Sequence, residues 1–415
     1  MLSLKITEKT SLKNILENYP ETFNVFLVNG FNYSSINEFL EEIGEKTMLK
    51  TLMNIRNINV DIFIKQLQEE INTLENEKNY LVDTVTIGDN IDFYGSPICS
   101  MKNTFRDDME SIVKKHYKET GDLLKVFVKS GNKTKDFSDE LMFNPKIDIF
   151  PNIVFTKEIK EYLGHDFRDK MIGKGYFKEN IYKDFNRDLK DIGIIENNEY
   201  CIYAVIPHVI VVDTEKLGDR PIPKTLKDLL NPVYKNDISI FGKQKDDFLS
   251  SALLYVYKEF GEDGLKKLAR NVRRSFHCAS MPKVAAMKSK DSPAIYLMSW
   301  FFSNTCYGKN IKVIWPEDGA IVVPMYMFVK KEGYEKVKPL VEYIIGEEFG
   351  EICKKANVIS TNPNIDNNLP KGAKLKWLGW DYIKENDVYK TLYKCSDIFL
   401  KEWEKHNEGS IRGCN

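Results

Sequence analysis

Residues 203–212 read YAVIPHVIVV, an apolar run interrupted only by Pro207 and His208. A second apolar run, VVPMYMFV, covers residues 322–329 and also contains a proline, Pro324. Runs of this length that are rich in β-branched and aromatic residues are typical of strands. The two runs therefore predict two long strands.

Shorter strand-like segments surround these runs and alternate with helical patterns. A helix capped near Asn103 and closed by Gly121 separates the first two, and another begins at Asp246 and Asp247. Strands that alternate with helices indicate βαβ units and a largely parallel sheet, so the fold class is α/β. The shorter predicted strands are residues 90–94, 124–128, 147–150, 238–241 and 312–315.

The first 79 residues carry a different pattern, that of a small all-α domain. Four helix starts are signalled by cap or proline residues. An apolar stripe with helical spacing follows the last start, and we interpret it as core. The starts are Ser11, Pro20, Thr47 and Asn59, and the stripe is Phe63, Leu67, Ile71 and Leu74.

Composition narrows the class of protein. The 415 residues suggest two or three domains, and 60 basic against 61 acidic residues argue against a nucleic-acid-binding surface. No run of about 18 apolar residues predicts membrane insertion. The first residues show no export signal and the seven cysteines form no C-x-x-C pair, so we expect a cytoplasmic, reduced protein.

Sequence motifs of catalysis are missing. The chain has no G-x-x-x-x-G-K-[ST], G-x-G-x-x-G, G-x-S-x-G or H-E-x-x-H. We therefore assign no catalytic residue, no metal ligand and no cofactor.

The N-terminal pattern resembles the small domain described as the hybrid-cluster-protein-associated redox disulfide domain. The resemblance covers about residues 3–73 and includes I-T-x-x-T-S-L-x-x-I-L-x-x-Y-P-E and the later N-G-F. Many members carry cysteines just after that element, whereas this chain has FNYSS at residues 31–35 and no cysteine before Cys99. The resemblance therefore implies a packing or partner-docking module without disulfide chemistry.

Three further segments resemble type II periplasmic solute-binding proteins of the iron, phosphonate and thiamine branch. They are IPKTLKDLLNPVYKNDISI (222–240), IKVIWPEDGAIVVP (311–324) and NVISTNPNI (357–365). The resemblance implies a two-lobed α/β fold with the ligand held between the lobes. It places the strand crossovers at the two long apolar runs, with one lobe at 84–206 plus 320–415 and the other at 207–319.

Ligands of such sheets lie beyond the carboxyl ends of strands, where helix N-termini favour anions. The loops at the predicted strand ends and crossovers supply the candidate ligand-binding residues. These are Ser96, Pro97, Cys99, Ser100, Pro151, Asn152, His208, Asp247, Ser250, Cys278, Ser299 and Trp300.

The leading hypothesis is a non-enzymatic protein that binds a small anionic solute and acts as a carrier or sensor. Hydroxyl and amide donors in the loops favour an anion over a transition metal. A cysteine-dependent enzyme is the first alternative, with Cys99 as nucleophile and His208 or His277 as base. A metal site of Cys99, His277 and Cys278, and a scaffold that docks a protein partner through the N-terminal domain, stay open as well.

Overall fold

The computed structural model describes residues 6–56, 58–75, 80–82, 84–85, 89–98, 101–129, 145–157, 162–179, 181–182, 184–197, 200–242, 248, 250–277, 279–286, 292–306 and 308–411. These residues divide into two compact units, with the boundary between Tyr80 and Leu81. Within the described residues, no helix has the length and apolarity needed to cross a membrane.

The first unit is helical and is built around a cluster of phenylalanines. The ring of Phe26 lies 5.7 Å from Phe31, 5.2 Å from Phe39 and 5.0 Å from Phe63, measured between centroids, and all four are fully buried. Edge-to-face aromatic contacts of this kind add to the free energy gained by burial. Its elements are α1 (Leu12–Asn18), η1 (Pro20–Thr22), α2 (Phe23–Val28), α3 (Ile36–Ile43), α4 (Leu49–Ile55) and α5 (Val60–Glu75).

Two predicted helix caps are confirmed and one is wrong. Ser11 Oγ accepts the N–H of Asn14 at the start of α1, and Asn59 Oδ1 accepts two N–H groups of α5. Thr47 does not cap α4, because its hydroxyl donates to the carbonyl of Ile43 behind it. Helix α3, which Ser35 caps, was not predicted.

The predicted stripe on α5 belongs to the core of this unit. Phe63, Leu67 and Ile71 are fully buried. The side chain of Leu74 lies outside the described residues.

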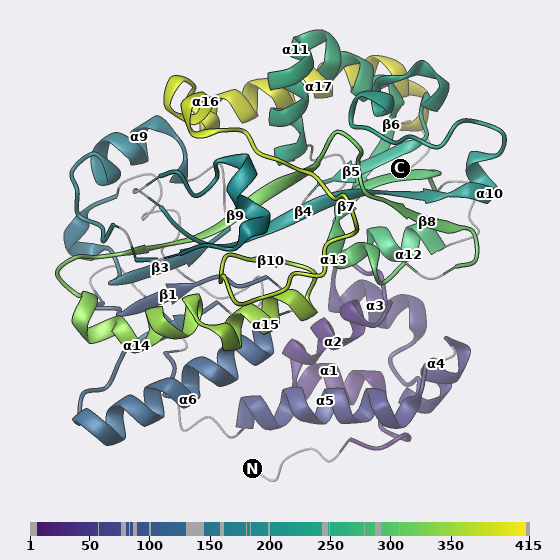
Figure 1. Cartoon of the computed structure of the whole chain (residues 1–415). Helices are drawn as coiled ribbons and strands as arrows, with labels where there is room; N and C mark the ends of the chain where they lie inside the picture. The colour runs from purple at the N-terminus through teal and green to yellow at the C-terminus, as the bar shows by residue number, and fades with distance from the viewer. Residues whose placement is uncertain are drawn as a thin grey trace. The chain divides into compact units, whose positions relative to one another are not determined.

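The second unit contains a mixed sheet whose main strand order is β2-β1-β3-β9-β4-β7-β5-β6 (Figure 1). Strands β1, β2 and β3 run parallel, as do β5, β6 and β7, whereas β9 is antiparallel to β3 and β4. The strands are β1 (Phe93–Gly95), β2 (Val126–Val128), β3 (Ile153–Thr156), β4 (Cys201–Asp213), β5 (Ile238–Phe241), β6 (Val272–Phe276), β7 (Ile295–Ser299), β8 (Ile311–Ile314), β9 (Ala320–Val329), β10 (Ile359–Ser360) and β11 (Leu375–Lys376).

The long strand β4 belongs to both halves of this sheet. Up to Pro207 it pairs with β9, and from His208 onward it pairs with β7 and β8. The exchange of partners falls at the proline and histidine that interrupt the apolar run. The division into lobes at residues 207 and 320 stays a prediction.

Helices cover the sheet on both faces. Figure 1 shows α6 (Lys102–Thr120), α14 (Tyr334–Ile345) and α15 (Glu347–Lys355) together on one face. Their contact with the sheet is aromatic, since Phe105 of α6 stacks on Phe155 of β3 at 4.8 Å and Phe155 stacks on Tyr203 of β4 at 4.3 Å. The remaining α-helices are α9 (His165–Phe167), α10 (Thr214–Leu217), α11 (Ser251–Asn271), α12 (Met281–Ala286), α13 (Trp300–Ser303), α16 (Trp380–Glu385) and α17 (Val388–Ile411).

The strand predicted at residues 147–150 is wrong. Residues Ile147–Ile149 form a 3₁₀ turn, and strand β3 begins at Ile153, after Pro151. The reason is burial, because β3 lies between β1 and β9 and every one of its residues is buried. Asp148 in the predicted strand would have placed a carboxylate in that position.

Candidate solute-binding site

Two groups of strands end toward each other over the middle of β4. Thr156, the last residue of β3, pairs with Tyr326 of β9, which pairs with Ile202 of β4. Ser299, the last residue of β7, pairs with His208 of β4, and β7 runs in the opposite direction. Residues 202 and 208 are six positions apart, about 20 Å along a strand. The carboxyl ends of β3 and β7 therefore face each other across residues 203–207.

The first side of this region is formed by the ends of β1 and β3. Ser96 and Pro97 follow β1, and the N–H of Ser96 donates to the carbonyl of Phe155 at 3.0 Å. Thr156 is buried, and Lys157 comes directly after it. The hydroxyl groups of Ser96 and Thr156 and the ammonium group of Lys157 thus belong to the adjacent carboxyl ends of β1 and β3.

The second side is formed by the ends of β5, β6 and β7. His277 directly follows β6, and its Nδ1 accepts the N–H of Ala279 at 3.3 Å. Ser299 is buried, and Trp300 begins α13 and packs edge-on against Trp315 at 5.2 Å. Each of these groups lies at the carboxyl end of a strand, as the sequence predicts for the ligand side of the sheet.

The two sides are coupled electrostatically. Loss of hydration lowers the pKa of His277, and the positive charge of Lys157 lowers it further. Lys157 follows β3 on the first side, whereas His277 follows β6 on the second. A site between them would therefore carry positive charge from one side and an imidazole from the other.

His208 lies between the two sides, on β4. Its Nδ1 is buried, and no described residue forms a hydrogen bond with it. Burial lowers the pKa of His208 to about 4, against the opposing effect of the backbone at Ile206 and Ile321. The imidazole is therefore neutral at pH 7 and can exchange hydrogen bonds with a ligand without introducing a buried charge.

Helix α11 follows β5 and begins on the second side. Ser250 is its N-cap and is buried, but its side chain makes no capping hydrogen bond. The first N–H groups of a long helix carry partial positive charge, which favours anions.

The placement predicted for Pro151 and Asn152 is wrong, since both lie at the amino end of β3, away from this region. Asn152 Nδ2 donates to Asp92 Oδ1 at 2.9 Å, and Lys336 lies 2.8 Å from the other oxygen of Asp92. These residues join the amino ends of β1 and β3 to α14 and serve the fold.

Four predicted residues, Cys99, Ser100, Asp247 and Cys278, lie outside the described residues. For Ser96, Pro97, His208, Ser250, Ser299 and Trp300, contact with a ligand stays a prediction. Thr156 and Lys157 are not among the predicted residues, because β3 begins six residues after the strand that the sequence predicts. The signal that marks them is the apolar run Ile153-Val154-Phe155 followed by two polar residues.

Two α/β halves that share the long strands β4 and β9, with strand ends converging between them, define a two-lobed solute-binding protein of the type II periplasmic class. The family model agrees with the fold. The chain belongs to the bacterial extracellular solute-binding protein family, whose model matches residues 148–386.

Solved structures of this class are similar to the chain at low sequence identity. The Trichodesmium protein IdiA (FutA), in complex with iron and citrate, has a TM-score of 0.52 and 14% identity over 76% of this chain and 99% of its own. The periplasmic binding protein P5PA has a TM-score of 0.50 and 16% identity over 76% and 99%. The apo ferric ion-binding protein A of Pasteurella haemolytica has a TM-score of 0.50 and 16% identity over 76% of this chain and 98% of its own. Among curated proteins, none matches the chain in sequence.

Proposed function

We propose that this protein binds a small anionic solute at the facing strand ends, with Lys157 and His277 on opposite sides of it, and releases it unchanged. The observation that carries the proposal is the geometry of the strand ends, since β3 ends at the level of Ile202 and β7 ends at His208, facing each other across residues 203–207 of β4. The effect of Lys157 in lowering the pKa of His277 agrees with it. A ligand placed between them gains Coulombic attraction from one side and hydrogen bonds from both.

The polar groups of the region suit an anion better than a metal ion. Ser96, Thr156 and Ser299 supply hydroxyl donors, helix α6 follows β1 on the first side, and helix α11 follows β5 on the second side. Within the described residues, no three His, Cys, Asp or Glu side chains gather as a metal site. Citrate, which the Trichodesmium structure holds together with iron, is an anion of the proposed kind.

Binding is tested by thermal unfolding and calorimetry of the full chain with carboxylates, phosphates and phosphonates. A ligand at a hundredfold excess over its Kd stabilises the fold by about 2.7 kcal/mol. Lys157→Gln should raise the Kd of the ligand about tenfold, since it removes a charged hydrogen-bond partner. Lys118→Gln, an exposed lysine near the end of α6, is the matched control and should leave the Kd unchanged.

The same screen separates the alternative functions. Binding of a transition metal that a chelator reverses and that Cys99→Ser abolishes would support the metal site and contradict the anion-binding function. Chemical turnover of a ligand would contradict the binding function. Stabilisation by an anion that is equal in Lys157→Gln and wild type would show that the ligand lies elsewhere.

The role proposed for residues 1–79 is to dock a protein partner. Support comes from three apolar side chains of this unit that are largely exposed, Val28 at 70%, Ile55 at 70% and Ile62 at 60%. Isolated exposed apolar residues are common on protein surfaces, so the test must replace them together. Loss of a co-purifying partner from the triple serine variant, with the ligand Kd unchanged, is the expected result.

A further inference from the structure

A second polar pocket lies at the amino ends of the strands whose carboxyl ends carry His277 and Ser299. Asp237 directly precedes β5, Ser292 lies three residues before β7, and Arg273 is the second residue of β6. The pocket has a volume of about 400 Å³, which suits a small ligand. It is therefore at the opposite edge of the sheet from the proposed solute site.

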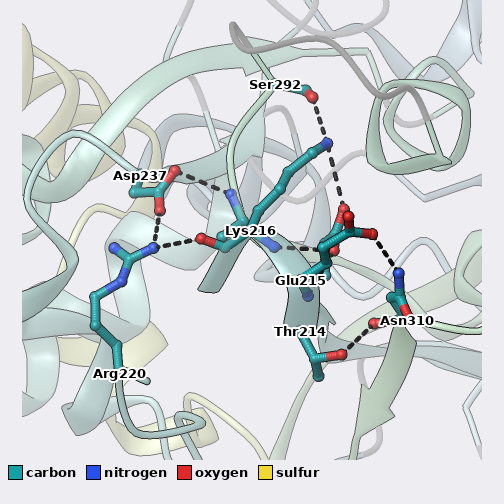
Figure 2. A network of polar contacts seen from close by, with 9 residues as sticks. Thr214, Glu215, Lys216, Arg220, Asp237, Ser292 and Asn310 are labelled. Atoms are coloured by element: carbon teal, nitrogen blue, oxygen red, sulfur yellow. Dashed lines mark hydrogen bonds and ion pairs between the residues drawn. The ribbon is translucent and has the colours of Figure 1, made fainter. Parts of the chain in front are cut away.

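The carboxylate of this pocket is already used within the protein. Figure 2 shows Arg220 reaching Asp237 and Lys216 reaching Ser292. Asp237 Oδ2 lies 2.5 Å from Arg220 Nη2, and Asp237 Oδ1 accepts the N–H of Ala294 at 3.0 Å. Both oxygens of Asp237 are occupied, so the pocket does not offer them to a cation.

Lys216 is held in place in the same way. Its Nζ donates to Ser292 Oγ at 2.5 Å and lies 3.4 Å from Asp213 Oδ2. The other oxygen of Asp213 accepts the N–H groups of Glu215 and Lys216 at 3.0 and 3.2 Å. The two ion pairs thus fix the positions of the Lys216 and Arg220 side chains at the pocket wall.

Arg273 and Lys235 complete a positive lining. Arg273 Nε donates to the carbonyl of Asn236 at 2.9 Å, which orients its guanidinium group. Lys235 is exposed and forms no ion pair with any residue that the structure describes. Among the described residues, four cationic side chains stand here against two carboxylates, Asp237 in the lining and Asp213 behind Lys216, an excess of two positive charges. Fixed Arg and Lys donors favour phosphate oxygens.

We propose that this pocket binds the phosphate group of a small phosphorylated ligand, as a second site separate from the solute site. A phosphate dianion matches the charge excess of the lining, and the guanidinium fork of Arg273 matches its geometry. The pocket volume of about 400 Å³ favours a small molecule over the acidic surface of a protein.

The test is calorimetric titration of the full chain with inorganic phosphate and glycerol phosphate at constant ionic strength. The background is Lys157→Gln, so that phosphate binds more weakly at the solute site and contributes less to the titration. In this background Lys235→Glu should weaken binding about tenfold or more, because a charged partner is replaced by a repelling one. Arg273→Lys keeps the charge but loses the fork and should weaken binding less.

The matched control is Lys384→Glu, an exposed lysine of α16 outside the pocket, which should bind phosphate as well as its parent. Equal affinities in Lys235→Glu and Lys384→Glu would overturn the proposal. Binding of an oligoglutamate peptide with no binding of either phosphate would also overturn it, in favour of a protein partner. Unfolding curves of each variant verify that the fold is intact.

Discussion

Replacing His208 by glutamine is expected to reduce the loss of stability in acid. The imidazole of His208 on β4 is half-buried with its Nδ1 shielded from solvent, and loss of hydration lowers its pKa from 6.5 to about 4. In the unfolded chain the ordinary pKa returns. The unfolded state therefore binds a proton at this residue at a higher pH than the folded state does, and acid favours unfolding.

The size of the effect follows from these two pKa values. A folded pKa below the unfolded one leaves stability unaffected above about pH 7 and lowers it as the pH falls from 6.5 toward 4. Proton linkage gives a loss of roughly 2.5 kcal/mol between about pH 7.5 and about pH 4.5. His208→Gln has no titrating group there, so its own loss over this interval should be smaller by that amount.

Urea unfolding of both proteins at the two pH values measures this difference directly. His116→Gln, which removes an imidazole from α6, is the matched control. The comparison uses the change with pH within each protein, so a general destabilisation by the substitution cancels. An acid loss as large in His208→Gln as in wild type would refute the argument from burial.

Three further predictions concern the fold, the thiols and the solute site. Asp92→Ala should lower the free energy of unfolding by about 3 kcal/mol, because the buried carboxylate accepts hydrogen bonds from Asn152, from the N–H of Lys125 and from half-exposed Lys336. Asp122→Ala, which removes an exposed carboxylate 3.9 Å from the same lysine, should cost little. Urea unfolding compares the two, and equal losses would contradict the role of burial. Burial raises the pKa of the four described thiols, which are Cys201, Cys306, Cys353 and Cys395. These thiols should therefore react with iodoacetamide much more slowly in the folded protein than after denaturation, which mass spectrometry of the labelled peptides measures. Rapid labelling of any of the four in the folded protein would contradict this prediction. A bound anion should raise the lowered pKa of His277, so binding takes up protons near pH 6 and the affinity increases from pH 8 to pH 6, which calorimetry in buffers of different ionisation enthalpy measures; an affinity that falls over this range would contradict an anion beside His277.

The sequence predicts those elements whose pattern is local. The apolar runs at β4 and β9, the cap Ser11 and the terminating Gly121, whose φ of +75° suits glycine, follow from residues that are neighbours in the chain. Strand β6 escapes prediction because it carries Arg273 and Arg274 in a short run at the end of the sheet order. There the strand pairs on one side only, and polar residues are tolerated.

The site is harder to predict, because it depends on register rather than on residue type. Pro151 and Asn152 have the composition of a ligand loop, but a shift of six residues in the position of β3 moves them to the opposite edge of the sheet. The same shift hides Lys157, whose charge acts on a residue 120 positions later in the chain. Lys157 and His277 can influence each other only because the sheet order places the ends of β3 and β6 on facing sides.

The two edges of the second group of strands differ in how their polar groups are satisfied, and this difference separates their roles. At the amino edge, Asp237 and Asp213 already hold Arg220 and Lys216, so this edge keeps its shape whether or not an anion is bound. At the carboxyl edge, the buried nitrogen of His208 has no partner among the described residues. Leaving a buried polar group unpaired costs about 1–3 kcal/mol, a cost that a ligand can remove. We therefore expect a solute that pairs with His208 to relieve this cost at the carboxyl edge, in addition to the stabilisation that binding at either edge supplies.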